Sequence, residues 1–132
     1  MLHLSKRFYL HALHNLNNPD WSDEENIRAF GKCYRLHGHD FKIESMFKGE
    51  PDKETGFLIH PDKFDSVIYE KIIDPYQGRN LNVLLPNPSG EGLSIAFYEI
   101  LKKEFGEKLV SVSVNETLKN YFRYPPTNAS LY

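Results

Sequence analysis

Residues 37–48 (HGHDFKIESMFK) alternate between apolar and polar side chains over most of their length, and this pattern most restricts how the chain can fold. Successive side chains of a strand point to opposite faces of a sheet, so the alternation predicts a strand with one buried face. Weaker alternation predicts three further strands at residues 4–16, 109–116 and 121–124.

Two segments carry apolar residues at helical spacing. The first opens at Pro61, because a proline in the first turn leaves no hydrogen bond unmade, and it is expected to end at Asp74-Pro75. The second follows Ser89, a candidate N-cap, and ends at Gly106. Residues 17–30 are polar and turn-rich, which predicts a long loop with one helical turn at most.

The remaining segment, residues 49–56 (GEPDKETG), contains glycine and proline and is typical of a turn. We expect it to lead into a short strand at residues 57–59 that forms a hairpin with residues 37–48. The resulting order is three strands, two helices and two strands. Grouped strands and helices favour an α+β fold, and the small buried surface of such a sheet favours self-association.

The chain has 132 residues, which fits a single domain spanning residues 1–132. Its net charge of -2 provides no basic field for nucleic acid. No apolar run approaches the roughly 20 residues of a membrane helix. His3, Lys6 and Arg7 interrupt the N-terminal region where a signal peptide would be apolar, so we expect a cytoplasmic protein.

Two histidines, His37 and His39, stand two residues apart on the clearest predicted strand and therefore share one face. A third histidine from the first strand would complete a three-histidine metal site with an open fourth position, as in catalytic zinc sites. Either His11 or His14 can be that third ligand, because their spacing of three residues places them on opposite faces. An isolated HxH is also compatible with two surface histidines.

The segment FGKCYRLHGHDF at residues 30–41 closely resembles the 6-pyruvoyltetrahydropterin synthase and 6-carboxytetrahydropterin synthase family. Members of that family have a cysteine before an HGH pair and an upstream Ala-x-His, which Ala12-Leu13-His14 matches. The resemblance therefore assigns the third ligand to His14. It continues through Thr55-Gly56, residues 87–91 and residues 114–117, and so covers almost the whole chain.

This resemblance implies the tunnelling fold (T-fold), in which an antiparallel four-stranded sheet carries two helices on one face. It also implies a homohexamer built around a barrel, with the sites at subunit interfaces. The expected substrate is 7,8-dihydroneopterin triphosphate or a related pterin-like molecule. The expected cofactor is a divalent metal, best assigned as zinc, although imidazole ligands also suit iron, nickel or copper. The metal ligands would be His14, His37 and His39.

The same resemblance implies roles for four other residues. Cys33 would be the catalytic base, since a nearby cation favours the thiolate. Glu116 would accept two hydrogen bonds from the pterin ring, with Thr117 beside it. Glu91 would contribute to substrate binding, although it can equally be a first-turn acid that stabilises its helix.

One element of the family is missing. Gln77 and Gly78 stand where the family has an Asp-His pair that transfers protons, and neither side chain titrates near neutral pH. His60 or His11 can supply the missing group, or the reaction can be an altered or slower lyase chemistry. A metal- and pterin-binding protein without catalysis, or a metal that only stabilises the fold, are the alternatives.

Overall fold

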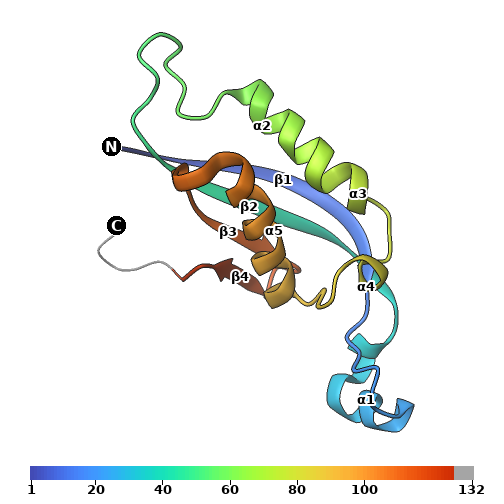
Figure 1. Ribbon diagram of the computed structural model, residues 1–132. Helices are drawn as coiled ribbons and strands as arrows, with labels where there is room; N and C mark the ends of the chain where they lie inside the picture. The colour runs from blue at the N-terminus through green and yellow to red at the C-terminus, as the bar shows by residue number, and fades with distance from the viewer. Residues whose placement is uncertain (127–132) are drawn as a thin grey trace.

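The computed structural model describes residues 1–126, and its sheet is antiparallel with the strand order β1-β2-β3-β4 (Figure 1). The strands are β1 (Leu2–His14), β2 (His37–Gly49), β3 (Leu109–Asn115) and β4 (Tyr121–Tyr124). The first two pair along their whole length, from Leu2 opposite Gly49 to His14 opposite His37. Residues 127–132 of the predicted domain lie outside the described range.

Helices α2 (Pro61–Ile68) and α5 (Gly90–Phe105) cover the same face of the sheet, as Figure 1 shows. Helix α1 (Asp23–Phe30) and the 3-10 turn η1 (Gly31–Tyr34) project beyond one end of the sheet. Short helical segments complete the chain: η2 (Tyr69–Ile73), α3 (Asp74–Tyr76), α4 (Leu81–Leu84) and η3 (Gly106–Lys108). The predicted α+β fold, with two helices on one face of a four-stranded sheet, is confirmed.

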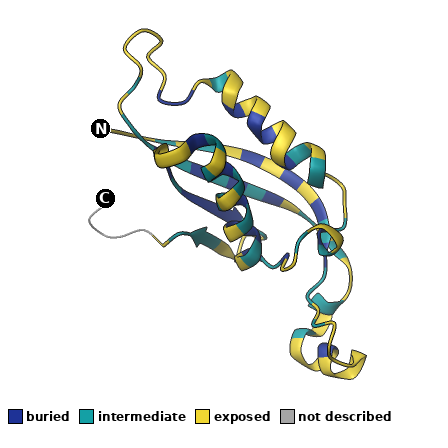
Figure 2. Cartoon of the chain, viewed as in Figure 1, coloured by how far each residue is buried: buried dark blue, intermediate teal, exposed yellow. Residues whose placement is uncertain are grey.

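The core lies between the sheet and these two helices. Burial alternates from residue to residue along β1 and β2 (Figure 2), as the sequence pattern predicts. Leu10, Phe41 and Ile43 are fully buried and belong to one apolar cluster with Phe97 and Leu101 of α5. Within residues 1–126, none of the helices has the length and apolar character needed to cross a membrane.

The predicted strand at residues 57–59 is wrong. Strand β2 pairs with β1 on one side and β3 on the other, so the sheet has no free position beside it. Leu58 and Ile59 are nevertheless buried in the core, and the preceding turn is closed by a hydrogen bond from the Asp52 N–H to the Phe57 carbonyl. The apolar residues indicated burial, which a loop over the core provides equally well.

The helix that begins at Pro61 does not end at Asp74-Pro75. It passes through the π turn η2, in which the Asp74 N–H donates to the Tyr69 carbonyl, and continues to Tyr76 as α3. Pro75 lies directly after this π turn, in the first turn of α3. The expected helix end is therefore wrong, and the helical path is longer.

Residues 17–30 contain more helix than the loop and single turn that we expect from the sequence. Helix α1 begins with a capping box, in which the Ser22 hydroxyl accepts from the Glu25 N–H while the Glu25 carboxylate accepts from the Ser22 N–H. Both residues were visible in the sequence as a Ser-x-x-Glu helix start. The N-cap at Ser89 and the helix end at Gly106 are confirmed for α5.

Replacing Phe97 by alanine should lower the free energy of unfolding by about 3–5 kcal/mol, because it leaves a cavity in the core. Ile95→Ala, on the same helix but 43% exposed, is the matched control and should change stability by only about 0.5 kcal/mol. Urea unfolding followed by circular dichroism measures both. Equal losses in the two variants would contradict the orientation of α5.

Candidate metal centre

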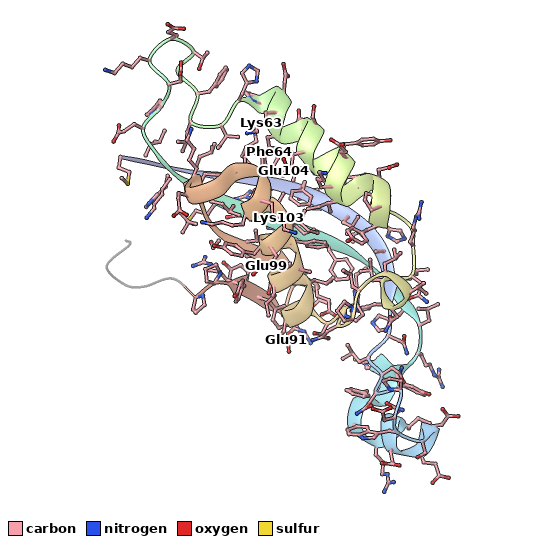
Figure 3. The ribbon with its side chains drawn as sticks, in the orientation of Figure 1. Lys63, Phe64, Glu91, Glu99, Lys103 and Glu104 are labelled. Carbon is pink, nitrogen blue, oxygen red and sulfur yellow. The ribbon has the colours of Figure 1, made fainter. Side chains whose placement is uncertain are left out.

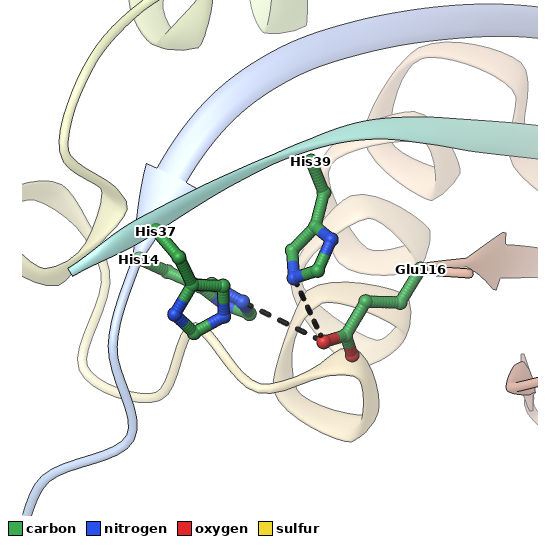
Figure 4. A group of neighbouring side chains, drawn as sticks. All are labelled: His14, His37, His39 and Glu116. Atoms are coloured by element: carbon green, nitrogen blue, oxygen red, sulfur yellow. Dashed lines mark ion pairs between the residues drawn. The ribbon is translucent and has the colours of Figure 1, made fainter. Parts of the chain in front are cut away.

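Four side chains converge where β1 ends, β2 begins and β3 has just ended: His14, His37, His39 and Glu116 (Figure 4). Each offers one ligand atom, and these four atoms all lie within 4.8 Å of one another. The register places His14 opposite His37 and Ala12 opposite His39, so the three imidazoles share the face of the sheet that carries the core. Their ring centroids are 4.6–5.0 Å apart.

Backbone carbonyls orient two of the imidazoles. His14 Nδ1 lies 2.7 Å from the Pro88 carbonyl oxygen, and His37 Nδ1 lies 2.6 Å from that of Arg35. A carbonyl only accepts, so both Nδ1 atoms carry the hydrogen and each Nε2 keeps its lone pair. This is how metal-binding histidines are commonly held, with one ring nitrogen bonded to the protein and the other free for the ion.

The Nε2 atoms of His14 and His39 are buried and make no hydrogen bond within the described residues. Glu116 Oε1 is 3.1 Å from His39 Nε2 and 3.6 Å from His14 Nε2, but neither contact has hydrogen-bond geometry. Burial lowers the pKa of His39, opposed by the Glu116 carboxylate and reinforced by His14 and His37. Two orphaned, buried nitrogens beside a carboxylate fit a divalent cation, because metal binding requires neutral imidazole.

Cys33 and Glu91 are not members of this cluster. Cys33 is half-buried on η1, four residues before His37, and its carbonyl accepts a hydrogen bond from the Leu16 N–H at 2.8 Å. Glu91 is exposed in the first turn of α5, where Figure 3 labels it at the start of the helix. The structure places both near the end of the sheet that carries the histidines, and their chemical roles stay predictions.

His60 lies at the other end of the sheet. It is the N-cap of α2, where its Nδ1 accepts from the Asp62 N–H at 3.1 Å. It lines a cavity that also includes Lys108, which immediately precedes β3, whereas Glu116 follows the last residue of β3. Seven strand residues, spanning roughly 20 Å, therefore separate His60 from the histidine cluster of the same chain.

His11 lies on the opposite face of the sheet, paired with a carboxylate that the sequence analysis did not identify. Its Nδ1 is 2.9 Å from Asp40 Oδ1, and both side chains are exposed. The residues in place of the family's Asp-His pair lie directly beside it: Gln77 Oε1 accepts from the His11 N–H, and the Gly78 N–H donates to the His11 carbonyl. Only the register between β1 and β2 brings His11 opposite Asp40, so no local signal predicts this pair.

A cavity of about 420 Å³ borders Glu116 and connects several of these residues. It is lined by Tyr9, Asp40, Lys42, Asn115, Glu116, Thr117 and Leu118. Two predicted substrate-binding residues, Glu116 and Thr117, thus share one cavity with the carboxylate that holds His11. Its volume falls within the range of small-molecule sites in proteins.

The fold and the histidine cluster together define a T-fold protein with a candidate metal centre at one end of its sheet. A family model described as 6-pyruvoyl tetrahydropterin synthase matches residues 3–127. The 6-pyruvoyl tetrahydrobiopterin synthase of Dictyostelium discoideum is 29% identical over 126 residues, covering 92% of this chain and 93% of that protein. The Homo sapiens protein of that name is 30% identical over 129 residues, covering 92% and 89%.

A solved structure agrees with this relationship. The 6-pyruvoyl tetrahydropterin synthase of Caenorhabditis elegans matches with a TM-score of 0.84 at 27% identity, covering 96% of each chain. The chain therefore belongs to the 6-pyruvoyl tetrahydropterin synthase family, a family of pterin-synthesising lyases. The family resemblance and the T-fold predicted from the sequence are confirmed.

Replacing His37 by alanine should strongly weaken the binding of divalent metal, because it removes a direct ligand. Mutating a residue that only supports a ligand typically costs about 10–100-fold in affinity, and we expect a larger loss here. His3→Ala, an exposed histidine outside the cluster, should keep full affinity. Zinc competition against a chromogenic chelator measures both. Circular dichroism should show that His37→Ala stays folded, whereas unfolding would indicate a metal that only stabilises the fold.

Proposed function

We propose that the chain is a metal-dependent lyase acting on 7,8-dihydroneopterin triphosphate or a related pterin that carries a polyol side chain. The observation that supports this most is the shared position of Glu116. Its carboxylate borders the 420 Å³ cavity and also lies within 3.6 Å of two imidazole nitrogens. Glu116 therefore links a ring bound in the cavity to the histidine cluster.

Recognition of the ring is assigned to Glu116 and Thr117 at the end of β3. The amino-pyrimidinone edge of a pterin presents two parallel N–H donors, and a carboxylate accepts both through its two oxygens. The Glu116 side chain is only 17% exposed, so such hydrogen bonds form in a partly desolvated site, where charge-assisted bonds are stronger.

His14, His37 and His39 would hold the metal, which we assign as zinc. When bound, a divalent cation would polarise substrate hydroxyls and acidify the adjacent C–H groups. Removal of a substrate proton is assigned to Cys33. This residue is half-buried on η1, and its carbonyl accepts a hydrogen bond from the Leu16 N–H, just beyond the end of β1. A neighbouring cation favours the reactive thiolate of such a cysteine.

The second proton-transfer group is assigned to His11. Its contact with Asp40 orients the ring, as carboxylates do for catalytic histidines. Gln77 and Gly78 lie against the His11 backbone, so His11 occupies the neighbourhood of the pair that they replace. His60, at the other end of β3, can act only at a site shared with a second subunit.

We also propose assembly into a homohexamer, and the two edge strands support self-association. Strands β1 and β4 each have one side without a partner strand among the described residues, and soluble proteins rarely leave long edges unpaired. The segment 77–80 covers β1 only near its end, through the Leu13–Asn80 bridge and the hydrogen bonds to His11. Pairing of β1 with β4 of a neighbouring subunit would close a barrel and bring sites to the interfaces.

A second candidate function is a metal- and pterin-binding protein that does not turn its ligand over. The replacement of the Asp-His pair by Gln77 and Gly78 favours it, because a site with one proton-transfer group fewer typically loses about 10²–10⁴-fold in rate. In that function His11 and Asp40 would only be a surface ion pair on the sheet.

Metal-loaded protein incubated with 7,8-dihydroneopterin triphosphate should release inorganic triphosphate, measured by anion-exchange chromatography, with acetaldehyde assayed in parallel for carbon–carbon cleavage. Chelation should abolish turnover and added zinc should restore it, since the cation activates the substrate. Absence of both products, together with tight pterin binding that Glu116→Ala removes, would support the binding protein and contradict the lyase.

His11→Ala should lower kcat by about 10²–10⁴-fold if His11 transfers a proton. The comparison is His60→Asn, which keeps an N-cap side chain for α2 and should retain wild-type kcat within a few-fold. Single-turnover kinetics with matched metal content measure both variants. The reverse outcome, with only His60→Asn inactive, would move the group to His60 at a site between subunits.

A further inference from the structure

The carboxylate of Glu116 lies close to two histidine nitrogens, although recognition of a pterin ring does not require that contact. Its Oε1 atom is 3.1 Å from His39 Nε2 and 3.6 Å from His14 Nε2 (Figure 4). The side chains of His14, His39 and Glu116 are 1%, 18% and 17% exposed, so both contacts lie largely out of solvent. Neither contact is a hydrogen bond, so the nitrogen lone pairs and the carboxylate oxygen remain available to a shared cation.

The two distances match the geometry of a four-coordinate ion. Zinc bonds to imidazole nitrogen and carboxylate oxygen are about 2.0–2.2 Å long, so the ligand atoms of a regular tetrahedron lie roughly 3.3–3.6 Å apart. The Glu116 contacts of 3.1 and 3.6 Å bracket this edge. Because His37 belongs to the same 4.8 Å group, a single ion can accept three imidazoles and Glu116 with only small side-chain movements.

We infer that Glu116 is the fourth protein ligand of the resting metal ion and leaves the metal when the pterin binds. This inference rests on the proposed function, because it uses the pterin-binding role assigned to Glu116. The carboxylate has two oxygens, and a ring with two parallel N–H donors engages both of them. Glu116 therefore exchanges one oxygen's metal bond for a ring hydrogen bond, and a coordination position opens only when the ring is in place.

Coordination of the metal by Glu116 would protect the site from side reactions in the absence of a pterin. A three-histidine ion with an open position binds water and lowers the pKa of that water, which permits unwanted hydrolysis. With Glu116 coordinated, this position is filled until a ring that can occupy the cavity of Tyr9, Lys42 and Thr117 arrives. Only ligands with a matching donor pair would then expose the reactive position.

The first test is metal affinity in full-length Glu116→Gln, with Glu99→Gln as a control of equal charge change. Glu99 is exposed on α5, where Figure 3 labels it, and it is not a member of the cluster. We expect zinc to bind at least about ten-fold more weakly to Glu116→Gln, the lower end of the range for residues that support a metal. Unchanged affinity in Glu116→Gln would overturn the inference. Thermal unfolding of the metal-free proteins confirms that both variants are folded.

The second test uses Co²⁺, whose visible absorption reports coordination number and ligand type. Thiocyanate should change the spectrum of Co²⁺-loaded Glu116→Gln at concentrations at least ten-fold below those needed for wild type, because the variant has an open position. Neopterin, a pterin with a trihydroxypropyl side chain, should shift the wild-type spectrum as Glu116 leaves. Equal thiocyanate binding in both proteins, or neopterin binding without a spectral shift, would contradict the ligand exchange.

These readouts separate the inference from the proposed function. If metal affinity and the Co²⁺ spectrum depend on Glu116 but the wild-type protein turns over no pterin, the ligand exchange is supported and the proposed lyase activity is contradicted. If the wild-type protein is an active lyase but the Glu116→Gln variant has wild-type zinc affinity, only the inferred ligand exchange is contradicted.

Discussion

The antiparallel pairing of β1 with β2 is the constraint on which the candidate site depends. In this register His14 lies opposite His37, and Ala12 opposite His39, so three imidazoles reach one face at the end of the ladder. A shift of one residue would turn His14 to the opposite face. The register is held by burial, because the same shift would expose core residues such as Leu10 and Phe41.

The same pairing gives the other face of the sheet a different chemistry. His11 lies opposite Asp40 there, and the segment that carries Gln77 and Gly78 is hydrogen-bonded to the backbone of His11. Glu116 follows the third strand and borders both the histidine cluster and the cavity on Asp40's side. The histidine cluster, the cavity beside Glu116 and the His11–Asp40 pair are thereby concentrated at the ends of three strands.

Patterns that depend on neighbours in the chain could be predicted well. Strand alternation in residues 37–48 and the helix signals at Ser89 and Gly106 correspond to the observed elements, because side-chain direction and capping are local properties. The strand expected at residues 57–59 failed, since the apolar pattern reports burial and says nothing about which sheet positions are already occupied. The loop expected at residues 17–30 is wrong, because the capping box of Ser22 and Glu25 starts a helix there, and this signal too is local.

By itself, the sequence determined the fold class, the family and the shared face of His37 and His39, because these follow from periodicity, spacing and a nearly chain-long resemblance. Residue spacing placed His11 and His14 on opposite faces but left them as equal candidates, until the family resemblance selected His14. The tertiary structure alone gave them their partners, Asp40 for His11 and the metal-site cluster for His14. Asp40 and Glu116 reach the site through pairing between strands that are distant in the chain. Such pairing is decided by the packing of the whole core, which no short segment encodes.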